Sequence, residues 1–228
     1  MRYFFEISYD GTNYHGWQKQ PNSKTIQETI EKCFSTILKQ KIDIVGAGRT
    51  DAGVHARKMI AHFDYSFDLN STKLSHQLNS FLPSDIAICN IYEVNQDAHA
   101  RYSAISRSYE YIISFKKNPL LFNRVYHLSK KLDIDQLNNA SNILFNHNDF
   151  RSFSKSKTDV KTFNCKILNA KWKLDGDLLV FSIKANRFLR NMVRAIVGTL
   201  IEVGQNSLDI ESFNQIILKK NRKFAGYS

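Results

Sequence analysis

The sequence is poor in the residues that mark several common protein classes. Only three of its 228 residues are cysteine, namely Cys33, Cys89 and Cys165, and no two of them form a Cys-x-x-Cys pair. An odd number of scattered cysteines argues against a disulfide framework or a thiolate metal site, so we expect reduced, mostly buried thiols. No His-x-x-x-His pair occurs, and His55 with His62 supplies too few ligands for zinc. We therefore expect no metal.

Long apolar runs and common nucleotide-binding loops are also missing. No run approaches the roughly 18 to 20 apolar residues that span a bilayer. The first residues, MRYFFEISYDG, carry Glu6 and Asp10 where a signal peptide would be uncharged. We therefore expect a globular, cytoplasmic protein with no membrane partner. Neither GxxxxGKS/T nor GxGxxG is present, which argues against a phosphate-cradling loop of those types.

What the chain does have is a one-sided excess of positive charge. The net charge is +11, and residues 1–103 carry 11 basic and 11 acidic side chains, whereas residues 104–228 carry 21 and 10. A lysine-rich solvated surface is the simple explanation for a single cation. An excess confined to one half indicates a polyanionic partner instead.

The order of expected elements predicts an α+β protein with two similar halves, 1–103 and 104–228. Strand-like segments at 3–9, 42–48, 58–65 and 86–92 alternate with helices at 26–38 and 74–82, the first beginning at a Thr25 and Glu28 capping box. This order matches the split βαβ, ferredoxin-like unit with an antiparallel sheet. The series begins again with a strand at 108–114, a helix near 133–145, a hairpin over 166–184 and a further helix containing Met192. Residues 155–161 are the best candidate for a mobile loop.

The most informative stretch is residues 46–56, GAGRTDAGVHA, which places the carboxylate of Asp51 beside the guanidinium of Arg49. Gly46, Gly48 and Gly53 can bend the chain sharply and leave Asp51 open to an approaching molecule. An ordinary Asp-x-Gly turn, with the carboxylate bonded to nearby N–H groups, explains the same letters. From the loop alone both interpretations stay open.

Two further features are consistent with a nucleic-acid site. Tyr109 lies on the expected strand at 108–114, and three arginines follow an i, i+3, i+7 spacing expected to form one helical stripe. The three are Arg187, Arg190 and Arg194. Together with Asp51 they predict an acidic nucleophile in a basic, aromatic cleft between the halves. RNA suits such a cleft because its unstacked bases lie on aromatic rings while cations hold its phosphates.

GAGRTDAGVHA resembles the catalytic signature of the tRNA pseudouridine synthases of the TruA type. Other segments resemble that family in the same order along nearly the whole chain: SYDGTNYHGWQKQ at 8–20, TIQETIEK at 25–32, AHARYSA at 98–104, RSYEYII at 107–113, DFRSF at 149–153 and ANRFLRNMVRAIVGTLIEVG at 185–204. The resemblance implies the pseudouridine synthase fold, with the basic active-site cleft flanked by two antiparallel sheets. It also implies isomerisation of uridine to pseudouridine at positions 38 to 40, in the anticodon stem-loop of tRNA, by a homodimer that needs no cofactor.

By this resemblance, Asp51 matches the nucleophile, Arg49 the arginine that helps turn out the base, Tyr109 the tyrosine that stacks on the uracil, and Arg194 the arginine that pairs with the aspartate. Four residues are expected to contact the RNA: Arg101, Arg187, Arg190 and His55. The reaction breaks the C1'–N1 bond and rejoins the uracil through C5, which requires an ionised carboxylate near C1'. An aspartate with the reference pKa of about 3.9 is ionised near neutral pH. Either Tyr109 or a water takes the proton from C5.

The resemblance also implies a last strand of Gly-Leu-x-Leu character after residues 221–226, and the sequence has no counterpart for it. Two alternatives follow from the residues. One is a non-catalytic RNA-binding protein derived from this family. The other is a metal-dependent nuclease that uses Asp51, Asp10 and His55. We expect His15 and Trp17 to be structural.

Overall fold

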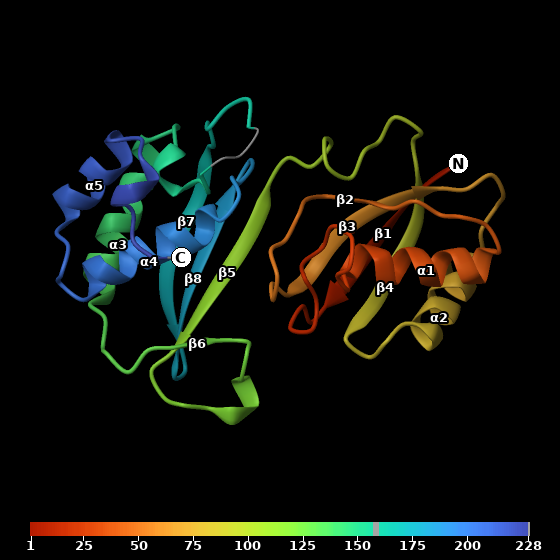
Figure 1. Ribbon diagram of the computed structural model, residues 1–228, viewed down its shortest axis with the longest axis horizontal. Helices are drawn as coiled ribbons and strands as arrows, with labels where there is room; N and C mark the ends of the chain where they lie inside the picture. The colour runs from red at the N-terminus through yellow and green to blue at the C-terminus, as the bar shows by residue number, and fades with distance from the viewer. Residues whose placement is uncertain (157–159, 228) are drawn as a thin grey trace. The chain divides into compact units, whose positions relative to one another are not determined.

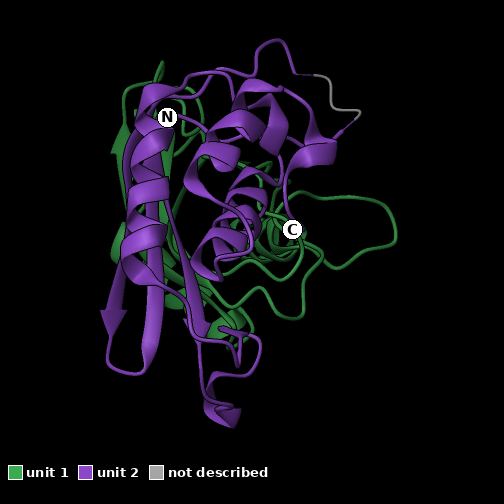
Figure 2. Cartoon of the chain, turned by 90° about the vertical axis from the view of Figure 1, so that its left-hand side faces the viewer, with its two compact units in different colours: residues 1–105 green, residues 106–228 purple. Residues whose placement is uncertain are grey.

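The computed structural model describes residues 1–156 and 160–227, so residues 157–159 of the expected loop at 155–161 lie outside the described residues. The chain divides into two compact units, residues 1–105 and 106–228, coloured separately in Figure 2. The division falls shortly after the position expected from the sequence, 103/104. Each unit has its own sheet and its own hydrophobic core.

The first unit is an antiparallel sheet of four strands in the order β2-β3-β1-β4 (Figure 1). Its elements are β1 (Arg2–Tyr9), α1 (Ile26–Leu38), β2 (Val45–Gly46), β3 (Ala56–Asp64), α2 (Ser71–Phe81) and β4 (Ile86–Val94). Both helices pack on one face of the sheet, where alternate side chains of β1 join those of α1 and α2 in one core. The ferredoxin-like order expected from the sequence is confirmed for this unit.

Aromatic side chains fill the centre of this core. The ring of Phe34 on α1 lies 5.1 Å from Phe5 on β1 and 4.8 Å from Phe63 on β3. Helix α1 begins as predicted, because the side chain of Thr25 accepts a hydrogen bond from the backbone N–H of Glu28. These contacts fix α1 against β1 and against β3, the strand that follows the Asp51 loop.

The strand expected over 42–48 is much shorter in the structure. Ile42 and Ile44 are buried, but their backbone N–H groups donate to Ser35 Oγ at 2.9 Å and to Glu31 Oε1 at 3.2 Å, both on α1. Side chains of α1 therefore accept hydrogen bonds from backbone N–H groups that would otherwise pair with a neighbouring strand. Within residues 42–48, β2 pairs with β3, and the backbone N–H of Ala47 donates to the Ile60 carbonyl at 2.8 Å.

The second unit has a four-stranded sheet in the order β6-β5-β8-β7. Its strands and α-helices are β5 (Arg107–Ser114), β6 (Tyr126–His127), α3 (Ile134–Ile143), β7 (Ile167–Asp175), β8 (Leu178–Ala185), α4 (Met192–Gly204) and α5 (Ile210–Leu218). The expected hairpin is β7 and β8, which turn at Gly176 with φ +57. The pairings of β8 are antiparallel, whereas the two residues of β6 pair with the end of β5 in parallel. The expectation of a purely antiparallel second sheet is therefore wrong at this edge.

The expected helical stripe of Arg187, Arg190 and Arg194 is also wrong. Helix α4 begins only at Met192, so Arg187 and Arg190 precede it, and only Arg194 lies on the helix. The reason is Asn191, whose left-handed backbone (φ 66, ψ 4) cannot continue a right-handed helix.

Helix α5 was not anticipated, although its start carries a recognisable signal. Asp209 caps it by accepting a hydrogen bond from Ser212 N at 2.6 Å, and Phe213 and Ile217 are buried at helical spacing. After α5 the described residues form the short 3-10 helix η4 (Arg222–Phe224) and no strand. No helix in the described part of the chain is both long and apolar enough to cross a membrane.

Candidate active site

The Asp51 loop connects β2 to β3 in the first unit. Arg49 is exposed and Asp51 is partly exposed. The backbone N–H of Val54 donates to the carbonyl oxygen of Asp51 at 3.2 Å and closes a tight turn. Gly53 lies within this turn at φ +73, a left-handed conformation that favours glycine.

A second segment, residues 9–17, holds this loop from the side of β1. The backbone N–H of Trp17 donates to the carbonyl oxygen of Thr50 at 3.2 Å, and the Gly53 N–H donates to the Tyr14 carbonyl at 3.3 Å. The hydroxyl groups of Tyr9 and Thr50 share a hydrogen bond of 3.0 Å. Asp51 is therefore flanked on both sides by peptides that are bonded to residues 9–17.

Glycines permit the close approach of the two segments. A Cβ atom on Gly16 would collide with the carbonyl oxygen of Thr50, and one on Gly11 would collide with that of Val54. Gly16 also has φ +87, which L side chains rarely adopt. A Cβ atom on Gly46 would lie 2.6 Å from the indole ring of Trp17. Sequence reasoning missed Gly11 and Gly16, although both lie in the segment at 8–20 that resembles the family.

The three loop glycines serve different purposes from those expected. Only Gly53 has a positive φ, whereas Gly46 makes room for Trp17. A Cβ atom on Gly48 would meet nothing within 4 Å. The loop is therefore shaped more by contacts with residues 9–17 than by three sharp bends.

His55 and Asp10 lie next to each other at the base of the loop. The Nδ1 atom of His55 is 3.0 Å from Asp10 Oδ1 and 3.2 Å from the backbone nitrogen of Gly11. The same carboxylate oxygen accepts hydrogen bonds from the backbone N–H and the hydroxyl of Thr12. This pair therefore contributes to the turn after β1. The part of the chain that the structure describes contains no group of three histidine, cysteine or acidic side chains arranged to hold a metal ion.

Segment 9–17 is itself fixed to the start of β4. The Tyr14 hydroxyl donates to Asp85 Oδ1 at 2.7 Å, and the Asp10 N–H donates to the Asp85 carbonyl at 2.9 Å. Burial raises the pKa of Tyr14, and the hydrogen bond to Asp85 raises it further, so the phenol stays protonated as a donor. Trp17 is buried, whereas His15 is exposed.

In the second unit, Tyr109 is held on β5 by aromatic packing. Its ring meets that of Phe188 edge to face, with centroids 5.2 Å apart and an interplanar angle of 87°. Tyr109 pairs across the sheet with Ile183 and is partly buried. Phe188 was not predicted as a site residue, although it lies between Arg187 and Arg190 in the segment that resembles the family.

Arg194 lies near the same face of β5. Burial raises the pKa of Tyr111, two residues along from Tyr109, and the positive charge of Arg194 opposes this rise. Burial likewise raises the pKa of the Cys165 thiol to about 11, against the opposing charge of Arg187. The charges of Arg194 and Arg187 therefore act on two groups of the second unit, the Tyr111 phenol and the Cys165 thiol.

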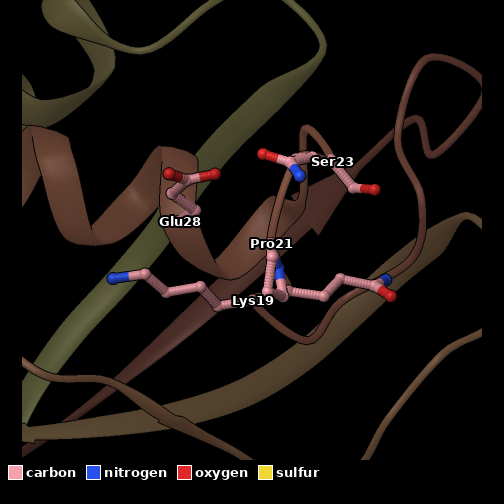
Figure 3. Close-up of a pocket in the computed structure, with 6 residues that line it drawn as sticks. Lys19, Pro21, Ser23 and Glu28 are labelled. Carbon is pink, nitrogen blue, oxygen red and sulfur yellow. The ribbon is translucent and has the colours of Figure 1, made fainter.

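The predicted site residues are divided between the units. Asp51, Arg49, His55 and Arg101 belong to the first unit, and Tyr109, Arg187, Arg190 and Arg194 to the second. A separate hollow of about 430 Å³ lies on the first unit near the start of α1 (Figure 3). Its lining contains none of the predicted residues and consists of Lys19, Gln20, Pro21, Asn22, Ser23 and Glu28.

Comparison with known proteins identifies the chemistry of this chain. A family model described as tRNA pseudouridine synthase matches residues 7–103 and 141–228. The tRNA pseudouridine synthase A of Parabacteroides distasonis is 50% identical over 228 residues, which cover 100% of this chain and 90% of that protein. The protein of the same name from Acetivibrio thermocellus is 42% identical over 222 residues, covering 96% and 91%.

These matches show that the chain is an isomerase that modifies tRNA. The chain belongs to the tRNA pseudouridine synthase family. In residues 1–156 and 160–227, the two four-stranded sheets and five α-helices are consistent with the fold of this family.

Proposed function

We propose that Asp51 is the nucleophile of this synthase and that its targets are uridines 38 to 40, in the anticodon arm of tRNA. The observation that carries the proposal is the support of the Asp51 loop. The residues on both sides of Asp51 are hydrogen-bonded to segment 9–17, while Asp51 itself stays partly exposed. Rigid support of an accessible reactive group is what an enzyme needs to keep a nucleophile at a fixed distance from its target.

The proposed reaction is balanced without any other reactant. The Asp51 carboxylate attacks C1' of the ribose, and the C1'–N1 bond breaks with its electron pair going to the uracil. The uracil rotates, and C5 attacks C1' and displaces the carboxylate. The proton leaves C5, N1 gains a proton, and the product is an isomer of the substrate. No electron is gained or lost overall.

The other predicted residues have complementary roles in the tRNA-bound enzyme. Extrusion of a stacked base costs a few kcal/mol, which protein contacts must offset. Arg49, exposed next to Asp51, fills the space that the base vacates. The ring of Tyr109, oriented by Phe188, covers the uracil, and Arg194 supplies the positive charge that pairs with the nucleophilic carboxylate.

The phosphates are contacted by side chains of both units, namely Arg101, His55, Arg187 and Arg190. The excess of basic residues in 104–228 supports this assignment, because phosphate contacts dominate the affinity of proteins for nucleic acids. We also propose that two copies of the chain act together on one tRNA in the cytoplasm.

The test is to incubate the protein with unmodified tRNA transcripts and to map pseudouridine by mass spectrometry. Separate transcripts carry a single uridine at position 38, 39 or 40. Asp51→Asn and Asp51→Ala are expected to abolish product while leaving tRNA affinity within about tenfold. Asp43→Asn is the matched control, because Asp43 is an exposed carboxylate of the same unit whose side chain is 72% exposed.

Normal turnover by Asp51→Asn would rule out the nucleophile, and product outside positions 38 to 40 would rule out the proposed target. Binding of tRNA without product by the unaltered protein would instead favour the non-catalytic alternative. Shortened RNA, or activity that a chelator abolishes, would favour the nuclease. Sedimentation with and without tRNA tests the proposed pair of copies.

A further inference from the structure

Residues 98–103 lie against the face of the first sheet that its helices leave uncovered. Phe4 alternates along β1 with Tyr3 and Phe5, which pack into the core under α1 and α2. Phe4 therefore projects from the opposite face. Its cross-strand partner is His62 on β3, and their rings stack with centroids 5.8 Å apart. The ring of His99 meets His62 edge to face at 4.7 Å.

Hydrogen bonds fix this segment to the sheet. The backbone N–H of Ala100 donates to Nδ1 of the buried His62 at 3.2 Å. A guanidinium nitrogen of Arg2 donates to the Ala98 carbonyl at 2.9 Å, while the rest of that guanidinium binds Asp64 through two bonds of 2.8 Å. The segment is thus held by two strands, β1 and β3.

The tip of the segment is a closed turn built around His99. The Nδ1 atom of His99 accepts hydrogen bonds from the backbone N–H groups of Arg101 at 3.1 Å and Tyr102 at 3.3 Å. The Ser103 N–H donates to the His99 carbonyl, and the Ser103 hydroxyl accepts from the His99 N–H, both at 2.9 Å. The backbone that carries Tyr102 is therefore ordered before any ligand binds.

This turn presents an aromatic ring to solvent. Tyr102 is 75% exposed, although its ring stays within 4.3 Å of the His99 ring, centroid to centroid. The Arg101 guanidinium lies over the Tyr102 ring at 5.6 Å. The result is a continuous series of rings, from Phe4 through His62 and His99, that ends in an exposed tyrosine beside a cation.

We propose that Tyr102 is a stacking surface for an unpaired base of the tRNA, distinct from the uridine that is isomerised. The chemistry favours a nucleotide over an apolar partner. The Tyr102 ring is 75% exposed and has a guanidinium over it, so a base can stack against this aromatic and cationic surface while the guanidinium neutralises its phosphate. The fixed turn reduces the conformational entropy that binding would otherwise cost. This inference rests on the proposed function in two respects: the RNA is tRNA, and Tyr109 covers the uracil that is isomerised.

The experiment measures the dissociation constant of unmodified tRNA transcript for the full chain and four variants. Tyr102→Ala is expected to raise it about tenfold, the size of effect that loss of one stacked base produces. Tyr102→Phe and Tyr102→Trp keep a ring and should stay within about twofold. Phe67→Ala is the matched control, because Phe67 is an aromatic residue of the same unit that is 63% exposed, and it should bind normally.

A second readout identifies the stacked base directly. 2-Aminopurine placed in turn at the unpaired positions of the tRNA reports stacking by loss of fluorescence. One position should be quenched by the unaltered protein and recover with Tyr102→Ala. The dependence of affinity on salt should be the same for Tyr102→Ala as for the unaltered protein, since no phosphate contact is lost. At saturating tRNA the rate of product formation should be nearly unchanged, so the effect falls on KM.

Unchanged affinity of Tyr102→Ala, or a loss just as large in Tyr102→Phe, would overturn the proposal, as would failure of the unaltered protein to bind tRNA. A change in sedimentation of Tyr102→Ala with normal tRNA binding would also overturn it and mark the ring as a protein contact. The proposed function fails separately. It fails if Asp51→Asn turns over normally or if product forms outside positions 38 to 40, and in either case the loss of 2-aminopurine fluorescence that depends on Tyr102 would still be observed.

Discussion

The Tyr9 hydroxyl lies 3.0 Å from Oγ1 of Thr50, the residue directly before Asp51. Tyr9 is the last residue of β1 and is buried, with its ring centroid 6.2 Å from that of Trp17. The end of a core strand therefore bonds to the neighbour of the proposed nucleophile. The position of Asp51 depends on the core of the first unit as well as on its own loop.

Tyr9→Phe is expected to lower the free energy of unfolding by about 1 kcal/mol, the usual net worth of one hydrogen bond, and to slow pseudouridine formation several-fold. Thr50→Val removes the other partner and should do the same. Because the two changes break one bond, the double variant should lose less than the sum of the single losses. Urea denaturation and initial rates measure both effects. Strictly additive losses would show that the two hydroxyl groups are not coupled.

Gly16→Ala is expected to displace the Asp51 loop. Its Cβ atom would collide with the Thr50 carbonyl at a backbone conformation of φ +87, so we expect turnover to fall at least tenfold and stability to fall by about 2 kcal/mol. Gly176→Ala is the matched control, because Gly176 also has a positive φ, +57, but a Cβ atom there meets nothing within 4 Å.

Gly176→Ala should therefore lower the melting temperature by a few degrees and leave turnover unchanged. Thermal denaturation and single-turnover rates separate the two variants. Normal turnover by a folded Gly16→Ala protein would contradict the account of the loop.

Stability should fall on acidification because of His62. The pKa of His62 is lowered to about 4, chiefly by burial and also by the positive charges of Arg2 and His99, against the opposing charge of Asp64. An unfolded chain has a histidine pKa near 6.5, so between these values the unfolded state binds more protons. The stabilisation is complete above pH 6.5 and is lost progressively as the pH falls towards 4, by at most about 3 kcal/mol.

Urea denaturation at pH values between 7.5 and 4 measures this loss. His62→Asn offers the control, since its amide oxygen can still accept the Ala100 N–H but does not titrate. The variant should be less stable at neutral pH and show a flatter pH dependence. An equal slope for both proteins would assign the acid sensitivity to other groups.

Phe188→Ala is expected to slow pseudouridine formation about tenfold without unfolding the protein. The reason is that Phe188 packs edge to face against Tyr109 at 5.2 Å, a contact worth about 1 kcal/mol or somewhat more. Phe188→Tyr keeps the ring and should recover most of the rate. Steady-state kinetics and thermal denaturation provide the measurements. If Phe188→Tyr is as slow as Phe188→Ala, the packing of Tyr109 is not the cause.

The sequence predicted those features that depend on local patterns. The first strand, the Thr25 cap of α1 and the hairpin that turns at Gly176 all appear as expected. Errors arose where tertiary contacts override local preference. Donors of Ile42 and Ile44 bond to α1 in place of a sheet, and the left-handed Asn191 delays the start of α4.

The candidate site shows the same division. The glycine and aspartate pattern at 46–56 was sufficient to find the loop, because the glycines, Arg49 and Asp51 lie close together in the sequence. The residues that fix the loop could not be derived in this way, since Gly16 acts through space on a carbonyl oxygen 34 positions later in the sequence. Likewise, nothing in the letters 98–103 indicates that His99 bonds the backbone beneath an exposed Tyr102.

The interlocking of Gly11 and Gly16 with the carbonyl groups of Val54 and Thr50 has a consequence for engineering. A library that randomises residues 46–56 alone would leave residues 9–17 unchanged. Most of its members would then no longer fit against residues 9–17. Transfer of the Asp51 loop into another protein would require residues 9–17 to be transferred with it.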